Sequence, residues 1–256
     1  MLYYQEKGEG SPIVLLHGYL ENLKMWETFG NEFSKSYKII AIDLPGHGHS
    51  KTYREVHTME FMAEKVVEVL DALQIEQAVL IGHSMGGYVT LALAELYPEK
   101  LKGFVLLNSS SLPDSEEKKA QRLKAVETAR ENLETLIKVS IPALFAEKNL
   151  SFLEKEVAFA KELAKETPVE GVAAALKGMR LRPDRTHILE KTEIPVGILI
   201  GQYDQAVNPE ELKKVIPENP NIYVKELETG HMSHLEAPNQ SFKFLQYFLK
   251  EVNWDN

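Results

Sequence analysis

The sequence contains no cysteine, which excludes disulfide bonds, thiolate metal sites and a cysteine nucleophile. Long apolar runs are also missing: they reach only about half a dozen residues, whereas a membrane-spanning helix needs about 20. The first residues, Met1 to Gln5, have neither the basic region nor the apolar core of a signal peptide, so we expect none. Together these absences favour a protein of the reducing cytoplasm.

Basic residues are too few to balance the acidic ones. The chain has 29 Lys and Arg against 38 Asp and Glu, a net charge of −9. Without a basic surplus a protein releases few counterions from a polyanion, which argues against nucleic acids and anionic membranes as partners. The hydrophobic share of 44% and the charged share of 26% are ordinary for a globular domain.

Seven short segments are expected to form β-strands. Most are continuous apolar runs, as in strands that are buried on both faces of a parallel sheet. The expected strands cover residues 2–6, 12–16, 38–42, 78–81, 103–107, 195–201 and 221–227. Amphipathic helical segments alternate with them. This alternation predicts an α/β fold with a mostly parallel sheet and helices on both faces.

Residues 112–187 interrupt that alternation. Charge-rich helical segments at 115–139, 151–166 and 169–179 follow one another without an apolar run of the strand type. We interpret this stretch as a helical cap, or lid, inserted into a core domain that is formed by residues 1–111 and 188–256.

The stretch from Ala78 to Gly87 has the pattern of a nucleophile elbow. Four apolar residues lead into Gly82-His83-Ser84-Met85-Gly86 and a helical segment follows, which places G-x-S-x-G between a strand and a helix. Such a turn strains the serine backbone, and only small residues fit two positions before and after it. The pattern predicts Ser84 as a nucleophile; the alternative is a structural glycine-rich turn.

A serine hydroxyl needs a base within hydrogen-bond reach, and that base needs a group that fixes its tautomer. In parallel sheets the working site lies at the carboxyl ends of the strands. His231 follows the last expected strand, directly after Gly230, and is the predicted general base. His234 is the competing candidate.

Asp204 is the predicted acid, because it follows the apolar strand at 195–201. The corresponding place one strand earlier holds Asn108-Ser109-Ser110 and has no carboxylate. Asp43 also follows a strand, but we expect it to bond the backbone of its own glycine-rich loop. The chain order Ser84, Asp204, His231 matches that of one known fold family.

Two backbone N–H groups are expected to stabilise the oxyanion of an acyl-transfer reaction. One belongs to Met85, the residue after the nucleophile, and the other to Tyr19, in the loop after the strand at 12–16. A mostly apolar substrate pocket is expected from a further set of side chains, for which plain core packing is the alternative. These are Trp26, Leu144, Phe145, Leu176 and Met179.

These motifs, with His17-Gly18, the segment from Asp43 to Ser50 and Gly201-Gln202-Tyr203-Asp204, resemble those of the α/β-hydrolase fold superfamily, in particular its small capped esterases, lactonases and peptidases. The resemblance implies an eight-stranded, mostly parallel sheet with one antiparallel strand and a helical cap after the sixth strand. Epoxide hydrolases and haloalkane dehalogenases of this fold have Asp where this chain has Ser84, so the resemblance favours serine hydrolysis.

The prediction is therefore a serine hydrolase that cleaves carboxylic esters of small to medium size through an acyl-enzyme. It needs no cofactor and no metal, and its expected partner is a small-molecule ester. A lactonase, thioesterase, carbon–carbon bond hydrolase, perhydrolase or aminopeptidase with the same triad stays open, as does a slow-turnover ligand receptor on this fold. No oligomeric state is predicted.

Overall fold

The computed structural model describes residues 1–254, and the strands within them form one seven-stranded sheet with the order β1-β3-β2-β4-β5-β6-β7. The strands are β1 (Tyr4–Lys7), β2 (Pro12–Leu16), β3 (Lys38–Ile42), β4 (Ala78–His83), β5 (Leu101–Leu107), β6 (Val196–Gly201) and β7 (Ile222–Leu227). β1 pairs antiparallel with β3, and the other neighbours pair parallel. The predicted α/β fold is confirmed.

The strand count expected from the resemblance is wrong. Within residues 1–254 the sheet has seven strands, and the helical insertion follows the fifth strand, β5. The physical reason lies in the sequence, which offers seven segments of the strand type; the eighth strand came from the resemblance alone.

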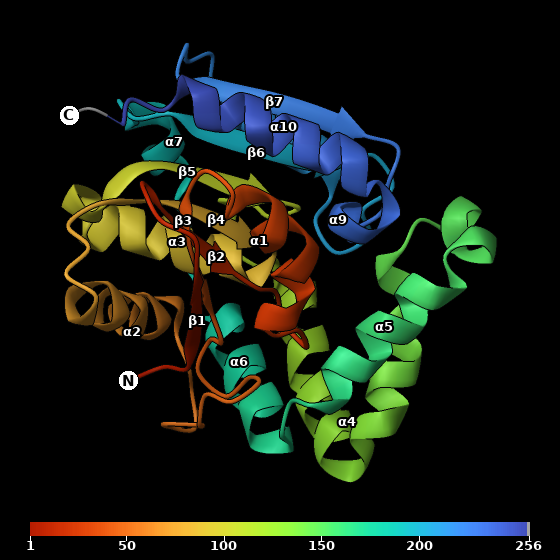
Figure 1. Cartoon of the computed structure of the whole chain (residues 1–256). Coiled ribbons are helices and arrows are strands. Elements are labelled where there is room, and N and C mark those ends of the chain that lie inside the picture. The colour runs from red at the N-terminus through yellow and green to blue at the C-terminus, as the bar shows by residue number, and fades with distance from the viewer. Residues whose placement is uncertain (255–256) are drawn as a thin grey trace.

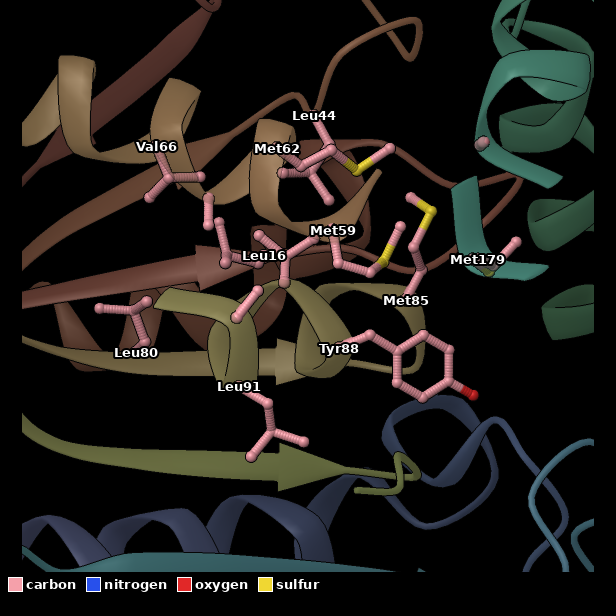
Figure 2. Packing of buried hydrophobic residues seen from close by; sticks show 14 of the residues in the cluster. Leu16, Leu44, Met59, Met62, Val66, Leu80, Met85, Tyr88, Leu91 and Met179 are labelled. Atoms are coloured by element: carbon pink, nitrogen blue, oxygen red, sulfur yellow. The ribbon is translucent and has the colours of Figure 1, made fainter. Parts of the chain in front are cut away.

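Alternate residues of each central strand point to opposite faces of the sheet, as the pleat requires. Val14 and Leu80 pack into one hydrophobic cluster, while Ile13 and Val79 pack into a second. The first cluster includes side chains of α2 (Met59–Ala72) and α3 (Met85–Leu96), and the second includes those of α1 (Glu27–Phe33) and α10 (Pro238–Glu251). Figure 2 shows part of the first cluster, where Met59 and Met62 of α2 lie close to Leu16 of β2 and Met85 of α3.

Between β5 and β6 the chain forms only helices and turns. They are α4 (Glu116–Ser140), η3 (Pro142–Leu144), η4 (Glu147–Phe152), α5 (Glu154–Lys165), α6 (Val169–Arg180) and α7 (Thr186–Lys191). Figure 1 shows α4 and α5 in green, set apart from the sheet on the side toward which the arrowheads of β5 and β7 point. The insertion therefore lies near the carboxyl ends of the parallel strands.

Two glycines let α6 lie directly on the loop that follows β3. A Cβ atom at Gly171 would overlap the carbonyl oxygen of Gly46, and one at Gly178 would overlap that of His57. The two glycines are seven residues apart and so share one face of the helix. Contact this close between backbones fixes the position of α6 on the sheet domain.

Further short helices lie between β2 and β3, between β4 and β5, between β6 and β7, and after β7. They are η1 (Leu23–Trp26), η2 (Pro98–Lys100), α8 (Pro209–Val215) and α9 (Ser233–Glu236). None of the helices in residues 1–254 has both the length and the hydropathy that crossing a lipid bilayer demands.

Candidate active site

Ser84 lies at the junction of β4 and α3, in a backbone conformation that few non-glycine residues adopt. Its φ of 49° and ψ of −113° are strained for an L-amino acid. A Cβ atom at Gly82 would overlap the carbonyl of Gly86, and one at Gly86 would overlap that of Leu16. The steric expectation for these two glycines is confirmed, and the turn has the geometry of a nucleophile elbow.

Three side chains from distant parts of the chain form one hydrogen-bonded line. His231 Nε2 lies 2.7 Å from Ser84 Oγ, and His231 Nδ1 lies 2.7 Å from Asp204 Oδ2. The side chains of His231 and Asp204 are only 4% and 2% exposed, so water does not compete for their contact. This is the geometry of a nucleophile, a base and an orienting acid.

Asp204 is held as a carboxylate by several donors. Its Oδ1 accepts the backbone N–H groups of Ala206 and Val207, both at 2.8 Å. Burial by itself favours the neutral acid, but His231 and the two backbone amides outweigh it and lower the pKa of Asp204. Asn108, which occupies the place after β5, donates from Nδ2 to Asp204 Oδ2 at 3.3 Å.

Neither of the competing candidates, Asp43 and His234, is hydrogen-bonded to Ser84 or His231 among the described residues. Asp43 is fully buried and accepts the N–H groups of Leu23 and His49, both at 2.8 Å, so it orders loops as expected. His234 is also buried, and among the described residues its two ring nitrogens have no hydrogen-bond partner. Neither residue takes the place of His231 or Asp204.

Residues 11–238 match the protein family described as alpha/beta hydrolase fold. The chain belongs to that family. Among curated proteins it is similar to the dihydrolipoyllysine-residue acetyltransferase component of the acetoin cleaving system of Pseudomonas putida, with 30% identity over 260 residues. That match covers 97% of this chain and 66% of the relative, so this α/β-hydrolase spans slightly less than two thirds of the relative's length.

Two solved structures are similar over almost the whole chain. A thermophilic esterase from Thermogutta terrifontis, solved with malate bound, shares 31% identity at a TM-score of 0.92, covering 98% of this chain and 93% of that one. The enol-lactonase of Burkholderia xenovorans LB400 shares 25% identity at a TM-score of 0.90, covering 98% and 96% of the two chains. Both likenesses extend through the helical insertion of this α/β-hydrolase.

A buried ion pair that no sequence motif indicates joins His83, in the elbow of this α/β-hydrolase, to Glu21 in the loop after β2. Glu21 Oε2 accepts from Gly18 N–H at 2.6 Å and lies 2.8 Å from His83 Nδ1. His83 Nε2 lies 3.0 Å from the carbonyl oxygen of His231. One carboxylate therefore connects the loop after β2 to the loop that holds His231.

The ionisation of this pair follows from its contacts. Burial would raise the pKa of Glu21, but His83 outweighs burial and lowers the pKa to about 2. Burial would likewise lower the pKa of His83, but Glu21 and the carbonyl of His231 raise it. Glu21 is thus a carboxylate and His83 an imidazolium that donates from both ring nitrogens.

Glu21, His83 and His234 also form a group that resembles a metal-binding set. Their potential ligand atoms lie within 4.8 Å of one another, and all three residues are buried. However, His83 already uses both ring nitrogens in hydrogen bonds, and a metal ion there would have to break its contact to Glu21. The hydrogen-bonded ion pair accounts for the arrangement without an ion.

A cavity of about 160 Å³ opens at Ser84 and His231. Of the pocket residues predicted from the sequence, Leu144 and Met179 line it, as does the side chain of Tyr19. The lining is mostly apolar, as expected, but Lys118 and Arg122 of α4 also contribute to it. Both cations were missed because charged residues on a charge-rich helix usually face solvent.

The other three predicted pocket residues lie outside this lining. Trp26 packs in the second hydrophobic cluster with its ring 6.2 Å from that of Phe29. Leu176 and Phe145 are both buried in the first cluster, and Phe145 also lines a different cavity. The prediction for these three is corrected: their apolar side chains serve packing, which was the stated alternative.

The backbone N–H groups expected to stabilise an oxyanion come from the elbow itself and from the loop after β2. Met85 is the first residue of α3, so its N–H is among those at a helix start that have no partner within the helix. Tyr19 follows Gly18, whose own N–H is fixed by Glu21. The ion pair thereby orders the loop that carries the Tyr19 N–H.

Proposed function

We propose that this α/β-hydrolase is a serine hydrolase that cleaves carboxylic esters through an acyl-enzyme intermediate. The observation that carries the proposal is the line of two 2.7 Å contacts from Ser84 through His231 to Asp204. The likeness to the Thermogutta terrifontis esterase supports the choice of substrate class.

The contacts define a role for each residue. His231 Nε2 removes the proton of Ser84 as the hydroxyl oxygen attacks the acyl carbon, and Asp204 stabilises the resulting imidazolium. The N–H groups of Met85 and Tyr19 donate to the oxyanion, where one such donor is typically worth about 3–4 kcal/mol of transition-state stabilisation. His231 then protonates the leaving alcohol and activates the water that hydrolyses the acyl-enzyme.

The size of the cavity favours a short acyl group. Pockets that hold drug-sized ligands measure roughly 300–1,000 Å³, whereas the cavity at Ser84 measures about 160 Å³. We therefore propose esters with short acyl chains as substrates.

We further propose that residues 112–187 act as a cap on a core of residues 1–111 and 188–256. Two hydrogen bonds and the lining of the cavity support this role. The N–H of His231 donates to the carbonyl of Leu144 at 2.6 Å, and Ala146 N–H donates to Glu236 at 3.1 Å. Leu144 and Met179, both from this stretch, line the cavity together with Ser84.

The test is the hydrolysis of 4-nitrophenyl butyrate by the wild type and by the variants Ser84→Ala and His231→Ala. Because triad members act as a unit, each change should lower kcat by at least about 10³-fold. Ser151→Ala, at an exposed position on the insertion, is the control and should leave kcat unchanged. A Ser84→Ala enzyme that keeps more than a tenth of the wild-type rate would rule out Ser84 as the nucleophile.

Lactone hydrolysis is a second candidate, favoured by the likeness to the enol-lactonase. A lactone is a cyclic ester, and the same steps open its ring while the alcohol stays tethered to the acyl group. A lactone and an open-chain ester of equal carbon number, compared in one assay, decide between the two by their kcat/KM values.

A further inference from the structure

The cavity at Ser84 is lined by two cations that lie one turn apart on α4. Lys118 and Arg122 both face the space that Ser84 and His231 open into. The one carboxylate in this lining is Glu21, and its charge is already matched by His83. The cavity therefore presents positive charge that its own lining does not neutralise.

A neighbouring carboxylate compensates only part of this charge. Asp114, whose side chain is 1% exposed, accepts from Nε of Arg122 and, at 2.6 Å, from Nη1 of Arg182. One buried carboxylate is thus the ion-pair partner of two guanidinium groups. Its contact with Arg122 also fixes the orientation of that side chain. Together with Lys118, the group contains three cations and one anion.

Lys118 has no anionic partner of its own. Its Nζ donates to the carbonyl oxygen of Ala206 at 3.3 Å, and no carboxylate in residues 1–254 lies within ion-pair distance of it. Burial and the nearby Arg122 lower the pKa of Lys118, while Asp114 and Asp204 partly offset them. A half-buried ammonium without a counter-ion is costly, and a bound anion would relieve that cost.

The hydroxyl of Tyr19 adds a third donor to the same cavity. It is buried and has no hydrogen-bond partner among the described residues. Arg122 Nη1 is poorly satisfied as well, because its acceptor is the sulfur of Met179 at 3.4 Å. An unsatisfied buried polar group typically costs about 1–3 kcal/mol. Three donors with weak acceptors or none therefore converge on the space beside Ser84.

We propose that the substrate of this site carries a carboxylate in addition to the ester, and that Lys118, Arg122 and the Tyr19 hydroxyl bind that carboxylate. The inference rests on the proposed ester hydrolysis and narrows its substrate to esters that also carry a free carboxylate. Charge-assisted hydrogen bonds from ammonium and guanidinium groups to a carboxylate are about twice as strong as neutral ones. They also orient the ester carbonyl toward Ser84.

Binding is measured first, by calorimetry on the Ser84→Ala variant, so that turnover plays no part. One pair of probes is monomethyl succinate and its amide, methyl 4-amino-4-oxobutanoate; the other is 3-acetoxypropanoate and its amide. The pairs place the acid on the acyl side and on the alcohol side. We expect at least one acid to bind about tenfold or more tightly than its amide.

The variant Lys118→Met in the Ser84→Ala background should reduce that preference about tenfold. Lys124→Met is the matched control, since Lys124 is exposed on the same helix and does not line the cavity. Equal affinity for acid and amide in both pairs overturns the inference, and so does an equal loss in the two lysine variants.

Kinetics with the wild type separates this inference from the proposed function. The ratio of kcat/KM for acid over amide should exceed ten for the preferred pair and should fall in Lys118→Met. If hydrolysis of 4-nitrophenyl butyrate depends on Ser84 but the acids are not preferred over their amides, the proposed esterase activity is supported and the carboxylate site is refuted. Selective binding of an acid without hydrolysis of any ester supports the carboxylate site and refutes the esterase.

Discussion

The substitution Glu21→Gln tests the buried ion pair of Glu21 and His83 most directly, because it keeps the size of the side chain and removes its charge. In the structure one oxygen, Glu21 Oε2, accepts from both Gly18 N–H and His83 Nδ1. His83 Nε2 at the same time faces the carbonyl of His231 at 3.0 Å. Both ring nitrogens must donate, which requires the imidazolium form of His83.

Glutamine cannot satisfy all of these groups. Suppose that the glutamine oxygen takes the place of Oε2. A charged His83 is then buried without a counter-charge, whereas a neutral His83 protonated at Nδ1 places its unprotonated Nε2 against the carbonyl oxygen of His231. If the glutamine amide nitrogen takes that place, Gly18 N–H faces another donor. Each arrangement leaves either a buried charge without a counter-charge or a buried polar group without a hydrogen-bond partner.

The expected loss follows from the burial of the pair, whose side chains are 1% and 5% exposed. Removing one partner of a buried ion pair costs about 3–5 kcal/mol, so the free energy of unfolding in urea at pH 6 should fall by that amount. Glu166→Gln is the control: Glu166 pairs with Lys24 at 2.7 Å, but the side chains are 40% and 47% exposed. Its expected loss is below about 1 kcal/mol.

The pH dependence gives a second check on the same variant. The pKa of Glu21 falls from 4.5 to about 2 on folding, so its contribution is present above pH 4.5 and is lost as the pH falls toward 2. The pKa of His83 rises above 6.5, so its contribution is present below pH 6.5 and is lost as the pH rises through the folded value. The difference between wild type and Glu21→Gln should be largest between these limits. A variant within about 1 kcal/mol of wild type at pH 6 refutes the charged pair.

Three further predictions concern the triad, the buried histidines and the elbow. Asp204→Asn should lower kcat for 4-nitrophenyl butyrate by about 10³- to 10⁴-fold, because His231 loses its orienting carboxylate; a loss below tenfold contradicts that role. Burial lowers the pKa of three histidines that are at most 2% exposed, to about 3 for His47 and His234 and about 4 for His57. Only the unfolded chain then binds these protons between pH 6.5 and 5, so the free energy of unfolding should fall by about 2 kcal/mol for each; an unchanged urea midpoint would show that they are not buried in neutral form. Gly86→Ala should unfold the protein or cost several kcal/mol, because its Cβ would overlap the Leu16 carbonyl. Gly30→Ala, where the nearest atom would be 3.7 Å away, should be neutral or stabilising by about 0.5–1 kcal/mol in thermal unfolding.

The resemblance to capped hydrolases predicted the fold, and the apolar runs predicted the positions of its strands. The resemblance also introduced two architectural errors, an eighth strand and a cap after the sixth strand, whereas the insertion follows the fifth. The apolar residues of the insertion were only partly informative, because helical spacing of Leu144, Leu176 and Met179 indicates a buried face without saying whether protein or cavity covers it. Leu144 and Met179 reach the cavity, and Leu176 does not.

The candidate line of Ser84, His231 and Asp204 was predictable from the sequence alone, since each residue follows a strand and parallel strands end at one edge of the sheet. The elbow is also predictable, because it depends on residues close together in the chain: the strained serine requires glycines two positions before and after it. Only the tertiary structure shows which charged side chains surround Ser84, His231 and Asp204. Glu21 and His83 are separated by 62 positions in the chain, and Lys118 lies on a helix where most charges face water. Burial and distance determine whether such groups ionise and what they bind, and both arise only when the chain has folded.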